Sequence, residues 1–483
     1  MAGATEGAPV DQRELIARVE RLPLSRPHFG LLVQGGLGYT FDGMDGAVVA
    51  FILPAAAAVF ALSGPEQGLL ASSTLMGFLF GALAAGLLGD RIGRRRVMMY
   101  ALALYALASV VAALAPNWPV LLSFRILAGV GTGAESAIIA PFLSEFVPSR
   151  YRGRYIGSLA GFFAYGFVFA ALLGYFLVPT FSQGWRIVQV ITALPILMLL
   201  WWRRVLPESP RYLLARGRAA EAEAVVVRLE ERVRRATGRE LPAPQPAALA
   251  AEVVAAPSGQ GIRAVAWLWR GPLARQTATT WALWFSITFA YYGFFTFIPS
   301  LLIHQGLTIT KSFGYAIGIY LAQIPGYYSA AFISERLDRK WTIGAYLAGG
   351  ALSALGLANA AGNSQLLWFG ILLSFFMNGT YACLYSYTPE VYPTPIRATG
   401  MGAASAFGRI GGILSPLIIG SAYASLGFTG VFVLTCAVLS VGVLAVLTLG
   451  VSTKGRTLED ISAETVGAAA AAVPGAAADE AGR

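Results

Sequence analysis

Long apolar stretches alternate with short polar ones along most of the chain. Twelve of these stretches reach about 20 residues or more, which is enough to cross a bilayer as an α-helix. The first six fall at 29–60, 68–89, 97–115, 119–143, 155–178 and 186–206; the second six fall at 277–302, 313–334, 342–360, 365–388, 399–425 and 428–450. The pattern predicts an all-α polytopic membrane protein with two sets of six spans joined by a polar linker.

Composition agrees with a protein embedded in lipid. The chain is 56% hydrophobic and only 12% charged, against roughly 25% charged residues in a soluble domain. Its formal net charge of +10 at first suggests nucleic acid. The basic residues lie, however, in short loops on alternate sides of the apolar stretches, which is typical of the cytoplasmic face of a membrane protein. We therefore expect a lipid bilayer as partner and no nucleic acid.

The basic loops also predict the orientation. Arginines cluster after the second, fourth, eighth and tenth spans, whereas the opposite loops hold little beyond Arg186 and Lys311. The positive-inside rule then places both termini in the cytoplasm, for a multi-pass protein of the cell inner membrane. The expected parts are a cytoplasmic N-terminal segment (1–28), an N-terminal six-helix bundle (29–206), a cytoplasmic linker (207–275), a C-terminal six-helix bundle (276–450) and a cytoplasmic tail (451–483).

The polar parts differ in character. Met1 to Pro27 lacks the short apolar core and cleavage site of a signal peptide. Within the linker, the stretch around Gly217 to Arg235 predicts an amphipathic surface helix. The stretch from Leu241 to Gly261 is rich in Pro and Ala and predicts a flexible connection. The Ala- and Gly-rich tail beyond 464 predicts disorder.

A constant offset of 245 residues relates the two halves. It matches Asp90 with Glu335, Arg91 with Arg336, Arg94 with Arg339, Glu145 with Glu390, and Arg152 with Arg397. Acids fall on acids and bases on bases without a gap, which indicates an internal duplication. Parallel repeats around a binding site near the bilayer midplane are a recurring architecture of secondary transporters.

The loop GLLGDRIGRRR, residues 86–96, carries the sharpest motif. Asp90 ends one span, Gly93 permits a tight reversal, and the arginines begin the next span. Residues 335–340 form its degenerate copy. The loop resembles the signature of the major facilitator superfamily, although a merely topogenic basic loop is the alternative. The resemblance implies a twelve-helix major facilitator fold and a gating charge latch at Asp90, Arg91 and Arg94, and we extend the gating role to Glu145, Arg152, Glu335, Arg336, Arg339, Glu390 and Arg397.

Charged residues inside the first half suggest proton coupling. Asp42 and Asp45 share one side of the first span, where two carboxylates are costly unless they face water, pair or bind a proton. Arg125 is a natural counter-charge for one of them and begins a stretch that resembles the RxxxGxxxG motif of proton-coupled members of the superfamily. Glu135 is a further candidate. The alternatives are that Arg125 only braces helices, that the aspartates only cap or form salt bridges, and that Glu135 is structural.

The second half has no equivalent acid pair and offers aromatic and amide groups instead. The candidate substrate contacts are Tyr291, Tyr292, Gln323, Asn378, Tyr385 and Arg409. Aromatic rings with a few hydrogen-bonding groups suit a flat ring, and an arginine suits a carboxylate. Ordinary core packing is the alternative for the aromatic residues, and pairing with Glu390 or a backbone carbonyl is the alternative for Arg409.

Several strings are similar to those of bacterial nicotinate (niacin) transporters and their relatives, the synaptic-vesicle glycoproteins and organic-ion carriers. They are FDGMD (41–45), YYGFF (291–295), LAQIPG (321–326), YTPE (387–390), IRATG (396–400) and AFGRIGG (406–412). The chain departs from this branch at Ala160 to Gly166. The resemblance implies proton-driven uptake of a small organic anion by alternating access. A sugar or organic-cation carrier and a non-transporting receptor remain the alternatives.

The sequence favours none of the other function classes. The two cysteines, Cys383 and Cys436, lie inside predicted spans, and His28 and His304 are the only histidines. These residues form no disulfide framework, metal cluster or nucleophile–base pair along the sequence. We therefore expect no enzyme activity, cofactor or metal, and a carrier that works as a monomer with a small-molecule substrate and protons as partners.

Overall fold

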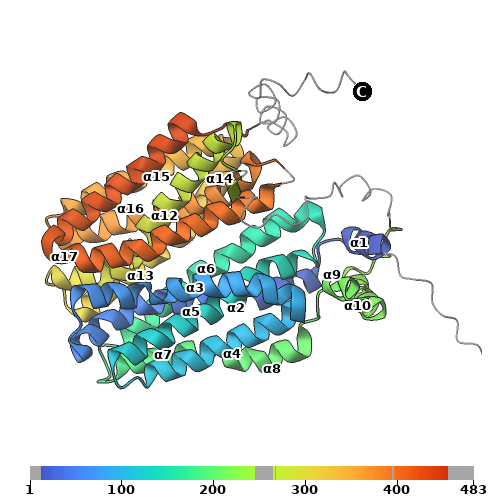
Figure 1. Cartoon of the computed structure of the whole chain (residues 1–483), viewed down its shortest axis with the longest axis horizontal. Helices are drawn as coiled ribbons and strands as arrows, with labels where there is room; N and C mark the ends of the chain where they lie inside the picture. Colours follow the sequence, from blue (N-terminus) through green and yellow to red (C-terminus); the bar gives the residue numbers. More distant parts are fainter. Residues whose placement is uncertain (1–11, 245–264, 267, 394–395, 455–483) are drawn as a thin grey trace, which may run out of the picture. The chain divides into compact units, whose positions relative to one another are not determined.

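The computed structural model describes residues 12–244, 265–266, 268–393 and 396–454, and these contain long α-helices and no β-strand (Figure 1). Part of the predicted flexible connection and the whole tail beyond 464 lie outside the described residues, as do the side chains of Asp90 and Glu335. The described chain forms two compact units: Met1–Ile52 with Ser73–Val254, and Leu53–Ser72 with Ala255–Arg483. The domain boundaries expected from the sequence stay predictions.

The first half begins with a short helix, α1 (Gln12–Glu20), and ends with two more, α9 (Pro210–Ala215) and α10 (Ala219–Thr237). Between them lie the long apolar helices α2 (Arg26–Phe60), α3 (Gly64–Ile92), α4 (Arg94–Ala113), α5 (Trp118–Ser144) and α6 (Ser149–Leu177), followed by α7 (Gly184–Thr192) and α8 (Ile196–Val205). Gly93, at φ 99°, makes the predicted tight reversal between α3 and α4, in a backbone region that favours glycine.

The second half contains α12 (Pro272–His304), α13 (Ile309–Leu321), α14 (Gln323–Arg336), α15 (Arg339–Ala358), α16 (Asn363–Val391) and α17 (Arg397–Leu449). Side chains before the first turns satisfy free backbone N–H groups: Thr308 accepts a bond from Lys311 and Asp338 from Lys340. In the same unit, Ser72 Oγ donates to the carbonyl of Ile413 at 2.8 Å, which ties the start of α3 to α17.

Ten helical segments among the described residues are long and apolar enough to cross a membrane. The count differs from twelve for two local reasons. The predicted eighth span is divided into α13 and α14 just before Pro325, which has no N–H to bond the preceding turn. The eleventh and twelfth spans follow each other without a loop inside the range of α17, and the backbone leaves helical geometry between them at Gly427 (φ 63°, ψ −173°), where the sequence predicts their boundary. The six-plus-six arrangement therefore holds, with the eighth span interrupted and the last two spans following each other directly within α17.

The predicted sixth span, 186–206, is also not one continuous helix. It is divided into α7 and α8 near Pro195, and together the two pieces have the length and apolarity of one span. Trp202 of α8 is fully buried in the core of the first unit, alongside Phe142 and Tyr105. The break therefore leaves the second piece packed in the core.

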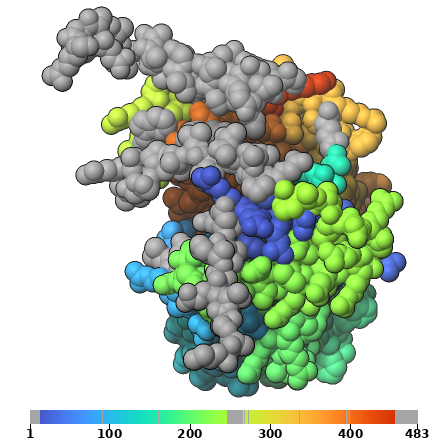
Figure 2. Space-filling model, turned by 90° about the vertical axis from the view of Figure 1, so that its right-hand side faces the viewer, coloured from blue at the N-terminus to red at the C-terminus, as the bar shows by residue number. Residues whose placement is uncertain are grey.

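The predicted surface helix is α10, which lies at one end of the first unit beside α9 and α1 (Figures 1 and 2). Ala222 and Val226 of α10 pack against Leu15 and Val19 of α1, whereas Leu229 belongs to the main core. The helix α1 was not predicted from the sequence, because its few apolar residues are interrupted by charges.

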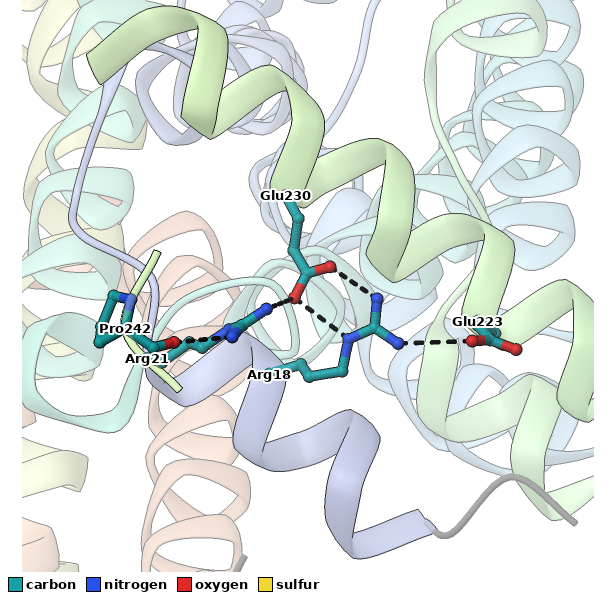
Figure 3. Close-up of polar contacts among 5 residues, drawn as sticks. All are labelled: Arg18, Arg21, Glu223, Glu230 and Pro242. Atoms are coloured by element: carbon teal, nitrogen blue, oxygen red, sulfur yellow. Dashed lines mark hydrogen bonds and ion pairs between the residues drawn. The ribbon is translucent and has the colours of Figure 1, made fainter. Parts of the chain in front are cut away.

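Those charges hold α1 in place (Figure 3). Arg18 donates to Glu230 of α10 at 2.6 and 3.1 Å, and Arg21 donates to the same carboxylate at 2.6 Å. Arg18 also reaches Glu223 at 3.5 Å, and Arg21 reaches the carbonyl of Pro242 at 2.6 Å. The N-terminal segment is therefore clamped onto α10 by charge-assisted bonds in addition to its apolar face.

Candidate functional site

A buried ion pair lies at the centre of the first unit. Arg125 Nη1 of α5 lies 2.6 Å from Asp45 Oδ1 of α2, and both side chains are fully buried. Arg125 Nη2 also donates to the Asp45 carbonyl at 3.0 Å and to Thr74 Oγ1 at 2.7 Å, while Thr132 Oγ1 lies 3.4 Å from Asp45 Oδ2. Three helices therefore supply one network around a single guanidinium group.

Glycines bring these helices close enough for the network to form. A Cβ added at Gly129 would clash with the backbone of Thr74, and one at Gly133 would clash with the backbone of Phe78. The glycines of the RxxxGxxxG stretch thus let α5 approach α3 at backbone contact, as small residues do in membrane helix pairs. The Thr74 hydroxyl can reach Arg125 because of this approach.

The other two acids lie nearby with fewer partners. Asp42 is 1% exposed, and its Oδ2 accepts a bond of 2.5 Å from Ser136 of α5. Glu135 is 1% exposed, and within the described chain neither of its carboxylate oxygens has a hydrogen-bond partner. The structure therefore brings Asp42, Asp45, Glu135 and Arg125 into one buried region, where three carboxylates accompany a single arginine.

Tyrosines form the corresponding centre of the second unit. Tyr291 of α12 donates to Gln323 Oε1 at 3.0 Å, and Gln323 begins α14, just after the break in the eighth span. The Tyr291 ring lies 5.3 Å from that of Tyr292 and 5.2 Å from that of Tyr381 of α16, both edge to face. Such pairs are favourable through their quadrupoles and leave the hydroxyls to bond other groups.

Tyr385 and Arg409 join this cluster, whereas Asn378 does not. The Tyr385 ring lies 5.1 Å from that of Trp284. Arg409 of α17 lies near the hydroxyl groups of Tyr292, Tyr381 and Tyr385. Asn378 instead donates to the carbonyl of Ser374, one turn earlier in α16. One N–H of its amide is thus bonded within its own helix.

The predicted gating residues form the same ion pair in both units. Arg94 Nε lies 3.2 Å from Glu145 Oε1, and the residues 245 positions later, Arg339 and Glu390, lie 2.9 Å apart. Burial raises the pKa of Glu145, while a hydrogen bond from Ser209 and the charge of Arg94 oppose the rise. The internal duplication therefore extends from the sequence to a specific contact.

The remaining gating candidates make different contacts. Arg152 lies 3.2 Å from Glu20 at the end of α1 and donates to the Ser144 carbonyl at 3.1 Å. Arg336 lies over the Phe332 ring, with 4.0 Å between the guanidinium carbon and the ring centroid. The carbonyl of Arg91 accepts a bond from Arg216. Arg397 begins α17, and the charge latch proposed for Asp90 and Glu335 concerns side chains outside the described residues.

Several site residues were not identified from the sequence. Thr74 and Ser136 bond Arg125 and Asp42, yet hydroxyl residues are common in apolar helices and carry little signal alone. Tyr381 could have been found, because it precedes Tyr385 by one helical turn and so shares its face. Trp284 stands two turns before Tyr291 on α12, and the same periodicity would have indicated it.

The comparison with family models decides the affiliation. Residues 36–464 match the family described as "Sugar (and other) transporter". The chain belongs to this family. It is a multi-pass transporter with the major facilitator fold, and its relatives are transporters and not enzymes.

Individual relatives cover almost the whole chain of this transporter. It is 39% identical to the niacin transporter NiaP of Acinetobacter baylyi, over 88% of this chain and 94% of the relative. It is 36% identical to a putative niacin/nicotinamide transporter NiaP of Bacillus subtilis, over 85% and 92%. Among solved structures, the partially occluded, inward-open xylose transporter XylE of E. coli matches with a TM-score of 0.72 at 18% identity, over 89% of this chain and 99% of that chain. These matches confirm the predicted superfamily and fold.

Proposed function

We propose that this transporter takes up a small aromatic carboxylate of the nicotinate kind, together with protons, by alternating access. Sequence identities of 39% and 36% to niacin transporters over most of the chain support the substrate class. The observation that carries the proposal is that one unit contains a buried group of acids and the other contains an aromatic cluster with an arginine.

The acidic group supports proton coupling. Arg125 compensates Asp45, so Asp42 and Glu135 are left with no cation among the described residues within ion-pair distance. An ionised carboxylate in apolar surroundings is costly unless it is paired, which favours uptake of a proton. In this proposal, Asp42 and Glu135 exchange protons as the carrier changes state, and the Asp45–Arg125 pair holds the helices that carry them.

The tyrosine cluster supports recognition of a flat, anionic ring. Tyr291, Tyr292 and Tyr385 supply ring faces and hydroxyls, Gln323 supplies an amide, and Arg409 supplies a positive charge that a carboxylate can bond. The contact of Asn378 within its own helix favours a structural role for that residue. We infer substrate contact at Tyr291, Tyr292, Gln323, Tyr385 and Arg409 from the chemistry of their side chains and from their grouping in one unit.

The remaining parts of the proposal concern place and gating. The arginine-rich loops favour the cell inner membrane with both termini in the cytoplasm, and the carrier would act as a monomer. The Arg94–Glu145 and Arg339–Glu390 pairs would hold the cytoplasmic ends of the helices in one state of the cycle and separate in the other.

Transport in proteoliposomes tests the proposal. We expect a pH gradient, acid outside, to drive accumulation of labelled nicotinate by the unchanged protein and by E231Q, a control at an exposed position of α10. We expect D42N and E135Q to lose at least about tenfold of this accumulation, with D42N still exchanging labelled for unlabelled nicotinate. Full gradient-driven accumulation by both variants would exclude the coupling role.

The same vesicles test the substrate class. Nicotinate and benzoate should compete for uptake, whereas choline and hexoses should not. Competition by choline would instead assign the acids to a cationic substrate, and competition by hexoses alone would indicate a sugar carrier. Binding of nicotinate without any exchange would indicate a receptor.

A further inference from the structure

A large basic cavity lies in the first unit, near the ends of several of its helices, and none of the buried acids lines it. It has a volume of about 710 Å³ and lies among the start of α4, the end of α8 and the surface helix α10. Cavities of this size hold small-molecule ligands. Neither the transport proposal nor the gating ion pairs use it.

The wall of the cavity carries a strong excess of positive charge. Seven arginines and two glutamates line it. Both glutamates already have partners: Arg218 bonds Glu221 at 2.6 Å, and Glu208 Oε1 accepts the backbone N–H of Arg95 at 3.2 Å. In the described parts of the chain, no carboxylate lies within ion-pair distance of the other six arginines, which are Arg95, Arg96, Arg203, Arg204, Arg228 and Arg232.

The same cavity has an apolar side. Leu31, Phe146 and Leu229 line it and are buried, and Met99 lies beside them. Arg203 and Arg204 end the sixth membrane-spanning segment, so the arginines stand where the apolar span gives way to water. A ligand that fits both sides has an anionic head and an apolar body.

We propose that this cavity binds the phosphate group of an anionic phospholipid. Planar guanidinium groups bond phosphate oxygens in pairs, which makes arginine a frequent phosphate ligand. Basic segments directly beside the end of a membrane span are the usual recognition element for anionic lipids. Ile92 and Met99 also line the cavity and are only partly buried, which favours a lipid over a free phosphate ester, because only the lipid brings acyl chains to cover them.

Two matched charge removals on α10 test the site. Arg228 and Arg232 are one turn apart and both line the cavity, whereas Arg234 and Arg235 of the same helix do not. The variants R228Q/R232Q and R234Q/R235Q therefore remove the same charge from the same exposed helix. A third variant, R203Q/R204Q, removes two charges from α8 on the other wall.

Binding is measured on the purified full-length transporter by native mass spectrometry with phosphatidylglycerol and, separately, with zwitterionic phosphatidylcholine. We expect the unchanged protein and R234Q/R235Q to retain phosphatidylglycerol in preference to phosphatidylcholine. We expect R228Q/R232Q and R203Q/R204Q each to bind phosphatidylglycerol about 25-fold more weakly, because each of the two arginines near an anionic headgroup contributes roughly fivefold to affinity.

Three results would overturn the proposal. Equal weakening by R234Q/R235Q would mean that only the overall charge of the surface matters. Unchanged phosphatidylglycerol binding in both cavity variants would mean that the lipid binds elsewhere. Displacement of the lipid by inorganic phosphate or glycerol phosphate at concentrations equal to that of the lipid would assign the cavity to a soluble phosphate ligand.

Discussion

The centre of the first unit is held by a buried ion pair, whereas the centre of the second is built mainly from aromatic rings, with Arg409 beside them. In one, Arg125 joins Asp45 and Thr74; in the other, Tyr291 joins Gln323 and neighbouring rings. Yet both units keep an arginine–glutamate pair at equivalent positions near the ends of the helices. Duplicated halves have thus retained a structural contact and diverged where chemistry is expected.

This difference has a physical consequence. A buried ion pair depends strongly on both partners, because removing one leaves an uncompensated charge in apolar surroundings. An aromatic cluster divides its stabilisation among many small contacts, so one lost hydroxyl has a modest effect. The first unit should therefore be more sensitive to single polar substitutions than the second.

The strongest test removes one partner of the buried pair. We expect R125Q to lower the stability of the first unit by about 3 kcal/mol or more, since Asp45 would be left without its cation. The double variant D45N/R125Q should recover much of this loss, because it leaves no charge unpaired. Thermal unfolding of the detergent-solubilised protein measures both. If the double variant were no more stable than R125Q, the ion pair would not be the cause.

A second test asks whether charge also stabilises the outer part of the first unit. We expect E230Q to weaken the docking of α1 by about 2 kcal/mol, because Arg18 and Arg21 both donate to this carboxylate. Hydrogen exchange of residues 12–20 reports the docking. The neighbouring variant E231Q is the control, since Glu231 is exposed and its contact with Arg235 spans 3.7 Å. Equal exchange in the two variants would contradict the clamp.

The clamp should also depend on pH. Burial alone would raise the pKa of Glu230, but the hydrogen bonds and charges of Arg18 and Arg21 outweigh it and lower the pKa. A lowered pKa in the folded state means that the stabilisation is fully present above the ordinary value of about 4.3 and is lost as pH falls through the lower value. At each pH, exchange of α1 in the unchanged protein is compared with E230Q, and the difference should vanish in acid.

The third test concerns the aromatic cluster. We expect Y291F to lower stability by only about 1 kcal/mol, since it removes the hydrogen bond from the Tyr291 hydroxyl to Gln323 Oε1 and keeps the ring contacts. The affinity for nicotinate should fall more clearly than the stability if Gln323 is positioned by this bond. Y100F, at an exposed position of α4, is the control. A loss as large as that of R125Q would remove the distinction between the two units.

The sequence predicted the superfamily, the six-plus-six spans and the acids with their arginine, because each leaves a strong local signal. Apolar runs mark spans, and charges inside them stand out. It did not predict α1, whose docking depends on Glu230, more than 200 residues away. Nor did it predict the break before Pro325, since hydropathy does not register backbone geometry.

The selection of substrate residues shows the same limit. Tyr385 and Asn378 lie on one helix, and the sequence indicated both as candidate substrate contacts. The Tyr385 ring contacts the rings of Trp284 and Tyr381. The Asn378 amide instead donates one hydrogen bond to the carbonyl of Ser374 in the same helix. Helical periodicity alone cannot distinguish these two residues, because the contacts of each side chain depend on which neighbouring helix it faces.

The smallest effect should come from the retained ion pairs, and here the two units can be compared position for position. Glu145 is 8% exposed in its pair with Arg94, whereas Glu390 is 24% exposed in its pair with Arg339. We expect R94Q to cost about 1 kcal/mol and R339Q less than about 0.5 kcal/mol, since exposed pairs contribute little. Thermal unfolding measures both, with R154Q at an exposed position as control.

The dependence of stability on ionic strength distinguishes the Arg94–Glu145 pair from the Arg339–Glu390 pair further. Raising the ionic strength to about 1 M shortens the screening length to about 3 Å, which should remove the effect of R339Q. The effect of R94Q should persist, because the buried carboxylate of Glu145 keeps its desolvation cost whatever the salt. Equal effects of R94Q and R339Q at both ionic strengths would mean that burial does not distinguish the duplicated pairs, and that the two units have diverged only at their centres.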